Sequence, residues 1–123
     1  LENENDRIEY LDEVRRYKMH MRIERNPKAS KLAKEFHGLN CQACDFNFGE
    51  KYGILGVGYV EAHHRRPLSS LEPDKPVRHD IAEDFVVLCA NCHRMAHRLS
   101  DPSDIDELRR LIQNVTSDSL GTL

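Results

Sequence analysis

The sequence predicts an α+β domain in which two short strands are held between helices by a metal ion. Segments with the three- and four-residue apolar spacing of helices lie at both ends of the chain, and two short apolar runs, at 59–63 and 84–88, lie between them. Two Cys-x-x-Cys pairs, Cys41/Cys44 and Cys89/Cys92, bracket these runs. The 123 residues are enough for one domain with a modest core, which a bound metal would reinforce.

Two helices are predicted before the first cysteine pair, as an N-terminal extension over residues 1–37 that packs on the core. Within 6–23, apolar side chains recur at helical spacing, at Ile8, Leu11, Val14, Tyr17 and Met21. A second helix, at about 27–37, follows a capping Asn26, begins with Pro27 and ends at Gly38. Three of its apolar side chains are expected to face the core: Leu32, Ala33 and Phe36.

The central part, residues 38–99, is predicted to hold the strands and the chemistry. Residues 45–58 contain Gly49, Gly53, Gly56 and Gly58, and we expect them to be irregular. A short strand at 59–63, a polar loop over 65–83 and a second strand at 84–88 follow. The next helix is expected from about 91 to 99.

Residues 100–123 are predicted to form a C-terminal helix with a frayed end. Ser103 is expected to cap this helix, and fraying is expected after Val115. The side chains expected to face the core are Ile105, Leu108, Leu111 and Ile112.

The four cysteines can be read as two disulfides, as a redox centre or as a zinc site. Disulfides need an oxidising compartment, and nothing at the start of the sequence resembles a signal peptide. Two short-spaced pairs far apart in sequence readily form a tetrahedron of thiolates. We therefore predict a structural zinc on Cys41, Cys44, Cys89 and Cys92 in a cytoplasmic protein. No apolar run has the length needed to cross a membrane, so no membrane partner is expected.

The formal net charge of −3 conceals a strong segregation of charge along the chain. Residues 1–14 carry one basic and six acidic side chains, whereas residues 15–37 carry eight basic and two acidic ones. A local basic stripe can face phosphates even when the whole chain is acidic. The other interpretation is a solvated helix face, and charge alone favours that one.

Four histidines form the second chemical pattern. His63 and His64 lie at the end of the first strand, and His93 and His97 are spaced to share one face of a helix. Adjacent residues of a strand point to opposite faces, so one of the first pair is expected to join His93 and His97 as a third ligand. Three protein ligands leave an open position, as in catalytic metal sites. The remaining histidine could take a proton from water.

The run Glu61-x-His63-His64-x-x-Pro67, followed by Asp84 and by Cys89-x-x-Cys92-His93-x-x-x-His97, resembles the HNH endonuclease family, including its McrA-like restriction nucleases. The resemblance covers about residues 38–99. It implies a ββα-metal, treble-clef-like core with the four-cysteine zinc, flanked by the N-terminal helices and the C-terminal helix. A bacterial or phage origin fits this resemblance.

The resemblance also implies a role for each residue of the pattern. His63 would bind a catalytic divalent ion together with His93 and His97, His64 would be the general base, and Glu61 would support the site. Asp84 stands where the family has its central Asn. An ionised Asp accepts hydrogen bonds but does not donate them. It could brace the loop through backbone N–H groups, or its negative charge could raise the basicity of a nearby histidine.

The implied function is metal-dependent hydrolysis of DNA, with His64 deprotonating the attacking water and products that carry 5′-phosphate and 3′-hydroxyl ends. Three histidine ligands favour zinc, nickel, cobalt or manganese over magnesium. Specific cutting would require a recognition domain, which could lie upstream. A homodimer formed through the terminal helices could place two single-strand cuts opposite each other. Five basic side chains are candidates for contacts with DNA phosphates: Arg65, Arg66, Arg94, Lys28 and Lys31.

A second function from another class is an inactive, zinc-stapled module that binds DNA or protein through the basic segment at 15–37. The binding module would hold one metal per chain, whereas the nuclease would have two sites, one of them exchangeable.

Overall fold

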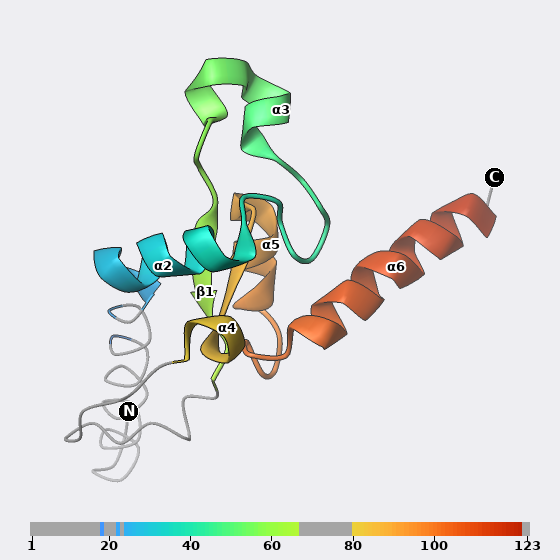
Figure 1. Ribbon diagram of the computed structural model, residues 1–123. Helices are drawn as coiled ribbons and strands as arrows, with labels where there is room; N and C mark the ends of the chain where they lie inside the picture. The colour runs from blue at the N-terminus through green and yellow to red at the C-terminus, as the bar shows by residue number, and fades with distance from the viewer. Residues whose placement is uncertain (1–17, 19–21, 23, 67–79, 122–123) are drawn as a thin grey trace, which may run out of the picture.

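The computed structural model describes residues 18, 22, 24–66 and 80–121. Most of the predicted helix at 6–23 and most of the polar loop at 65–83 therefore lie outside the described residues. The described chain is an α+β structure with one two-stranded sheet and a four-cysteine cluster (Figure 1). None of the helices described there is long and apolar enough to cross a membrane.

The sheet consists of β1 (Glu61–His64) and β2 (Phe85–Leu88), which pair antiparallel. Glu61 lies opposite Leu88, and His64 lies opposite Phe85. Both strands begin later than predicted, by two residues for β1 and by one for β2. The second shift arises because Asp84 ends a short helix, α4 (Ile81–Asp84), that the sequence analysis missed. Asp80 caps this helix through a hydrogen bond from the Ala82 N–H.

The two faces of the sheet pack against different helices. Side chains alternate along a strand, and directly opposed residues share a face. One face packs with Ala33 of α2 (Pro27–His37), and its sheet residues are Ala62, His64, Phe85 and Val87. The other face carries Glu61, His63, Val86 and Leu88 toward α5 (Ala90–Ala96) and α6 (Ile105–Gly121). The four residues of β2 are all buried, so both faces have an apolar centre.

Helix α2 has the bounds that its sequence predicts. The Asn26 side chain accepts the N–H groups of Lys28 and Ala29, and the helix ends at Gly38, whose φ of 86° favours glycine. Of the side chains expected to face the core, Ala33 is fully buried, but Leu32 is 39% and Phe36 64% exposed. The prediction was wrong for these two because α2 approaches the sheet through alanine.

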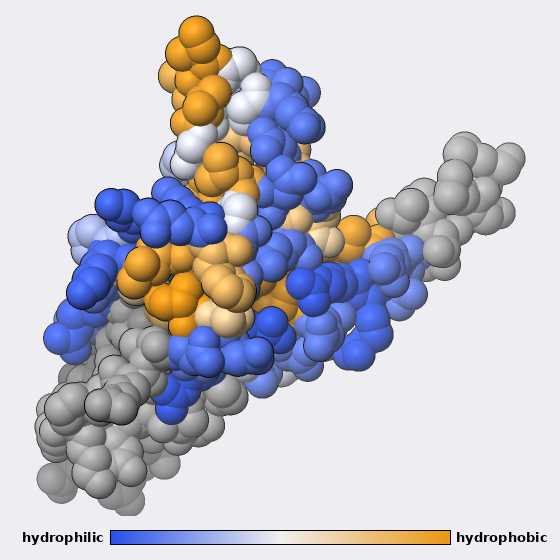
Figure 2. All heavy atoms as spheres, in the orientation of Figure 1, coloured by the Kyte–Doolittle hydropathy of each residue, from blue (hydrophilic) through white to orange (hydrophobic). Residues whose placement is uncertain are grey.

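The prediction of irregular structure over 45–58 holds at 45–47 and 57–58 but is wrong for residues 48–56. They form α3 (Phe48–Tyr52) and the 3-10 helix η1 (Gly53–Gly56), which together protrude from the body (Figure 1). A Cβ on Gly56 would lie 2.1 Å from the Phe48 carbonyl oxygen, so this close turn requires glycine. The apolar tip of the protrusion, with Ile54 94% and Leu55 87% exposed, is visible at the top of Figure 2.

The C-terminal helix α6 is longer than predicted and has a different cap. The Asp104 side chain accepts the Glu107 N–H, whereas the Ser103 hydroxyl donates to Asp101. Ile105 and Leu108 are buried and Ile112 packs against them, but Leu111 is 46% exposed. The helix continues past Val115 to Gly121. The expected fraying of its end stays a prediction.

Candidate metal centres

The four cysteines converge at one point between the first turn of α5 and the turn that follows α2. All are free thiols, and their sulfur atoms lie within 4.8 Å of one another, with Cys44 Sγ 3.7 Å from Cys89 Sγ. Cysteine sulfur in this arrangement is the ligand set of closed zinc sites. Cys41, Cys44, Cys89 and Cys92 are therefore positioned to hold a metal ion.

Local backbone geometry prepares both cysteine pairs for metal binding. The Cys44 N–H points to Cys41 Sγ at 3.5 Å, and the Cys92 N–H points to Cys89 Sγ at 3.4 Å. Amide dipoles directed at sulfur favour its thiolate form. Gln42 anchors the first pair to the sheet, since its N–H donates to the Val87 carbonyl and its side chain accepts the Val87 N–H.

The pKa values of the clustered thiols show that they do not all become thiolates together without a cation. A hydrogen bond from Cys92 lowers the pKa of Cys41 to about 4, even though burial acts in the opposite direction. Burial raises the pKa of Cys44 to about 11, and hydrogen bonding to Cys41 raises the pKa of Cys92. Protons alone therefore stabilise one thiolate at the expense of its neighbours, whereas a divalent cation could stabilise all of them.

A second cluster consists of Glu24, His63, His93 and His97, whose facing atoms also lie within 4.8 Å of one another. Glu24 is at the centre of the contacts. Its carboxylate oxygens lie 2.9 Å from His63 Nδ1, 3.0 Å from His93 Nε2 and 3.2 Å from His97 Nε2. His63 comes from β1, while His93 and His97 lie one turn apart at the end of α5, as their spacing predicts.

The nitrogens on the far sides of two imidazoles have their own acceptors. His63 Nε2 lies 2.6 Å from the Pro102 carbonyl oxygen, and His93 Nδ1 lies 2.9 Å from Glu61 Oε1. The Tyr59 hydroxyl donates to the other oxygen of Glu61. Carbonyl and carboxylate oxygens accept hydrogen bonds, so these outward nitrogens carry protons and the inward ones can present lone pairs. Metal-binding histidines are oriented in this way.

Without a cation, the same contacts would be hard to satisfy. His63 and His93 each face acceptors with both nitrogens, so each would have to carry a proton on both nitrogens and a positive charge. The two ring centroids are 5.1 Å apart, so the two charges would repel each other. Burial lowers the pKa of His63 and opposes that charge. Burial also acts to lower the pKa of His93, but Glu24 and Glu61 outweigh it and raise the value. Three imidazoles and one carboxylate therefore fit a divalent transition-metal ion.

The structure brings together His63, His93, His97 and Glu61, but it leaves the His64 ring on the other face of β1. His64 is fully buried, and its ring packs at 5.4 Å from the ring of Phe85. Its backbone N–H, in contrast, donates to Glu24 at 3.3 Å. The two adjacent histidines lie on opposite faces of β1, and His63 is the one in the cluster. The role of His64 as a base stays a prediction.

Asp84 lies where it can tie down the loop after β1. Its carboxylate accepts the Asp80 N–H at 2.8 Å, and its carbonyl accepts the Arg65 N–H at 2.8 Å. The side-chain contact therefore lies within α4 and its cap, and the contact with Arg65 comes from the main chain. Bracing of the loop by the Asp84 side chain stays a prediction. Because Arg65 follows His64 directly, Asp84 links the end of β1 to the start of β2.

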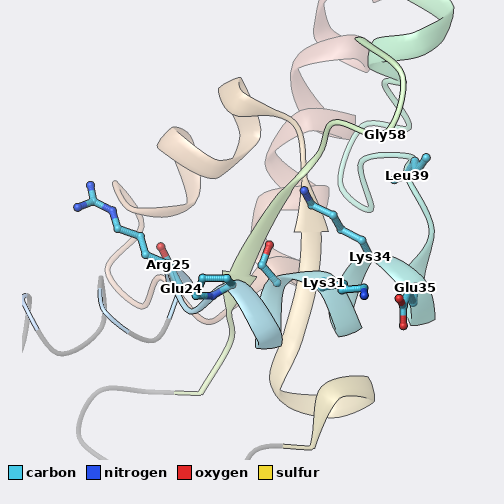
Figure 3. Close-up of a pocket in the computed structure, with 9 residues that line it drawn as sticks. Glu24, Arg25, Lys31, Lys34, Glu35, Leu39 and Gly58 are labelled. Carbon is cyan, nitrogen blue, oxygen red and sulfur yellow. The ribbon is translucent and has the colours of Figure 1, made fainter. Parts of the chain in front are cut away.

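A groove of about 850 Å³ runs beside the histidine cluster, lined by Glu24, His93 and His97 together with Arg25, Arg94 and Arg98. A second hollow of about 610 Å³ shares Glu24 and Arg25 with it and continues along Lys31 and Lys34 of α2 (Figure 3). Of the candidate phosphate contacts, Arg94 therefore lies beside the cluster, and Lys31 lies in the second hollow. Within the described part of the chain, three other candidates line neither hollow: Arg65, Arg66 and Lys28.

Glu24 is the site residue that sequence reasoning missed. It lies outside the 38–99 stretch that carries the resemblance, and no ligand spacing connects it to the histidines. One signal was available: Glu24 and Glu35 are the two acidic residues in a segment with eight basic ones. Its side chain is only 2% exposed, which is rare for a glutamate without partners.

Comparison with protein-family models, with curated proteins and with solved structures finds no match for this chain. The two clusters therefore have to be interpreted from their own geometry and chemistry.

Proposed function

We propose that this chain is a metal-dependent DNA endonuclease of the HNH type, acting in a restriction or mobile-element context. In this proposal β1, β2 and α5 form a ββα-metal core, the four cysteines hold a structural zinc, and the histidine cluster holds a catalytic divalent ion. One observation carries it: three imidazoles converge on a point beside an arginine-lined groove, with outward nitrogens held by Pro102 and Glu61.

In this proposal, side chains of the groove and of β1 divide the tasks of the reaction. A divalent ion held by the histidines would supply positive charge next to the scissile phosphate. Arg25, Arg94 and Arg98 would bind the DNA backbone, as exposed guanidinium groups do. Glu61 would keep the His93 ring oriented. His64 would take a proton from the attacking water on a ring nitrogen.

The experiment that tests this proposal is plasmid cleavage with a panel of divalent ions, on methylated and unmethylated DNA. Wild type is expected to cut DNA and to stop when the ion is chelated. A His64→Ala protein is expected to cut about 100 to 10,000 times more slowly, because it lacks the base, while its metal content stays unchanged.

The experiment tests separately whether His64 is the general base and whether the protein is a nuclease. Cleavage by His64→Ala at the wild-type rate would remove His64 from the mechanism but leave a nuclease. No cleavage by wild type with any ion or DNA would refute the nuclease proposal.

Glu61 provides a second prediction, for metal affinity. A Glu61→Ala protein should bind the ion of the histidine cluster about 10 to 100 times more weakly, because His93 loses the acceptor that orients its ring. Titration calorimetry on protein with an intact cysteine site measures this. Glu83→Ala, which removes an exposed carboxylate on α4, is the matched control and should bind normally. Equal affinities in the two variants would contradict the role of Glu61.

One observation favours the second candidate, a zinc-stapled binding module without catalysis. The ring of His64 is fully buried on the face of β1 opposite the histidine cluster. A base must reach the attacking water, and this position gives it no exposed surface. A binding module would retain DNA affinity through its basic groove, show no cleavage, and hold one metal per chain.

A further inference from the structure

Glu24 contributes to the histidine cluster from outside the two strands and the helix. It precedes α2, yet its carboxylate contacts the inward nitrogens of His63, His93 and His97 at 2.9–3.2 Å. We infer that Glu24 is a fourth protein ligand of the metal ion at this site. Four protein ligands would leave no free position on a tetrahedral ion, whereas an ion that accepts five or six ligands would keep free positions. This inference rests on the proposed function, since it concerns the ion that would support cleavage.

The burial of Glu24 supports a role as ligand. A carboxylate that is 2% exposed must have its charge compensated, because burying an isolated charge is costly. Its carboxylate contacts three imidazoles and accepts the His64 N–H. The outward nitrogens of His63 and His93 already donate to Pro102 and Glu61. A cation placed among the inward nitrogens would compensate Glu24 and allow both imidazoles to stay neutral.

The coordination number then distinguishes between metals. Structural zinc is almost always four-coordinate, and catalytic zinc keeps a position free by using three protein ligands. Three histidines and Glu24 would leave zinc no free position. Manganese and magnesium prefer octahedral coordination, so about two positions would remain for water and a phosphate oxygen. His93 and His97 are 16% and 26% exposed and line the groove, so substrate would approach from that side.

The ion that binds the histidine cluster most tightly should therefore not be the ion that best supports DNA cleavage. Zinc binds nitrogen and oxygen ligands more tightly than manganese does. Zinc at the histidine cluster should therefore bind more tightly than manganese but support less cleavage. Replacement of Glu24 by Gln weakens one ligand of the four and should raise zinc-supported cleavage relative to manganese-supported cleavage.

The test uses the full chain with its cysteine site loaded with zinc and its histidine cluster stripped by mild chelation, and it compares wild type with Glu24→Gln. Glu35→Gln is the matched control, because Glu35 is an exposed glutamate of the neighbouring hollow. Calorimetric titration with Mn²⁺ should give an affinity at least about tenfold lower for Glu24→Gln than for the control, as the loss of a metal-site contact does. Equal affinities would overturn the inference.

A measurement on wild type alone makes the test independent of how well the variant folds. Water-proton relaxation counts the exchangeable waters on bound Mn²⁺, and about two are expected with four protein ligands, against about three with histidines alone. Three waters would overturn the role of Glu24 as a ligand. If Glu24→Gln loses affinity but wild type cuts no DNA, the nuclease proposal fails and the ligand assignment stands. If wild type cuts DNA and Glu24→Gln binds Mn²⁺ normally, the nuclease proposal stands and the assignment of Glu24 as a ligand fails.

Discussion

A Cys41→Ser protein is expected to lose the zinc that we propose for the cysteine site, and with it most of its folded structure. A structural zinc site contributes about 10–16 kcal/mol of apparent binding free energy, whereas a domain is typically stable by about 5–15 kcal/mol. Cys41 is 2% exposed and belongs to the same buried cluster as Val86, Leu88 and Ile105. Removal of its thiolate therefore disrupts the apolar core as well as the metal site.

The loss should extend to the histidine cluster. Cys89 caps α5 and Cys92 lies in its first turn, so the cysteine site fixes the start of the helix that carries His93 and His97. Circular dichroism and metal analysis of Cys41→Ser should show both a lower melting temperature and the loss of both metals. Ala43→Ser places the same hydroxyl in the turn without removing a ligand, and it should stay folded. A folded Cys41→Ser protein that cuts DNA normally would contradict this dependence.

Under the nuclease proposal, a His97→Ala protein is expected to keep the proposed structural zinc and to lose the ion of the histidine cluster. His97 is the last residue of the cluster along α5, and its side chain is 26% exposed, so its removal leaves the core intact. Without the ion, the charge stabilisation of several kcal/mol that a metal gives to phosphate cleavage is lost, and the rate should fall about a thousandfold or more. Metal analysis and plasmid cleavage measure the two effects.

His37→Ala is the control for this prediction. His37 lies at the end of α2, where its ring contacts the Ile81 carbonyl and the Gln42 side chain. Its loss should lower stability but leave both metals and cleavage in place. Normal cleavage by His97→Ala, or equal loss of cleavage in both variants, would show that the histidine cluster has no specific role.

The parts of the fold that sequence predicted are those set by local rules. The helix at 27–37 follows from Asn26, Pro27 and Gly38, which act through contacts within a few residues. The pairing of His93 with His97 follows from helix geometry, and the separation of His63 from His64 follows from strand geometry. The convergence of the cysteine pairs followed from the chemistry of zinc ligands.

The parts that failed depend on long-range packing. Whether Leu32 and Phe36 are buried depends on which side of α2 meets the sheet, and Ala33 allows a closer approach than either. The cluster's carboxylate, Glu24, is 39 residues before His63, and no spacing rule relates them. The order of residues 48–56 rests on Gly56 packing against the Phe48 backbone, which glycine content alone does not predict.

The most direct test of the proposed nuclease is to count metals and measure cleavage in the same samples, before and after mild chelation. The nuclease should contain about two metals per chain, lose about one on chelation together with its cleavage of plasmid DNA, and recover both when a divalent ion is returned. A chain with one metal, no cleavage and no change on chelation would contradict the nuclease and support the binding module.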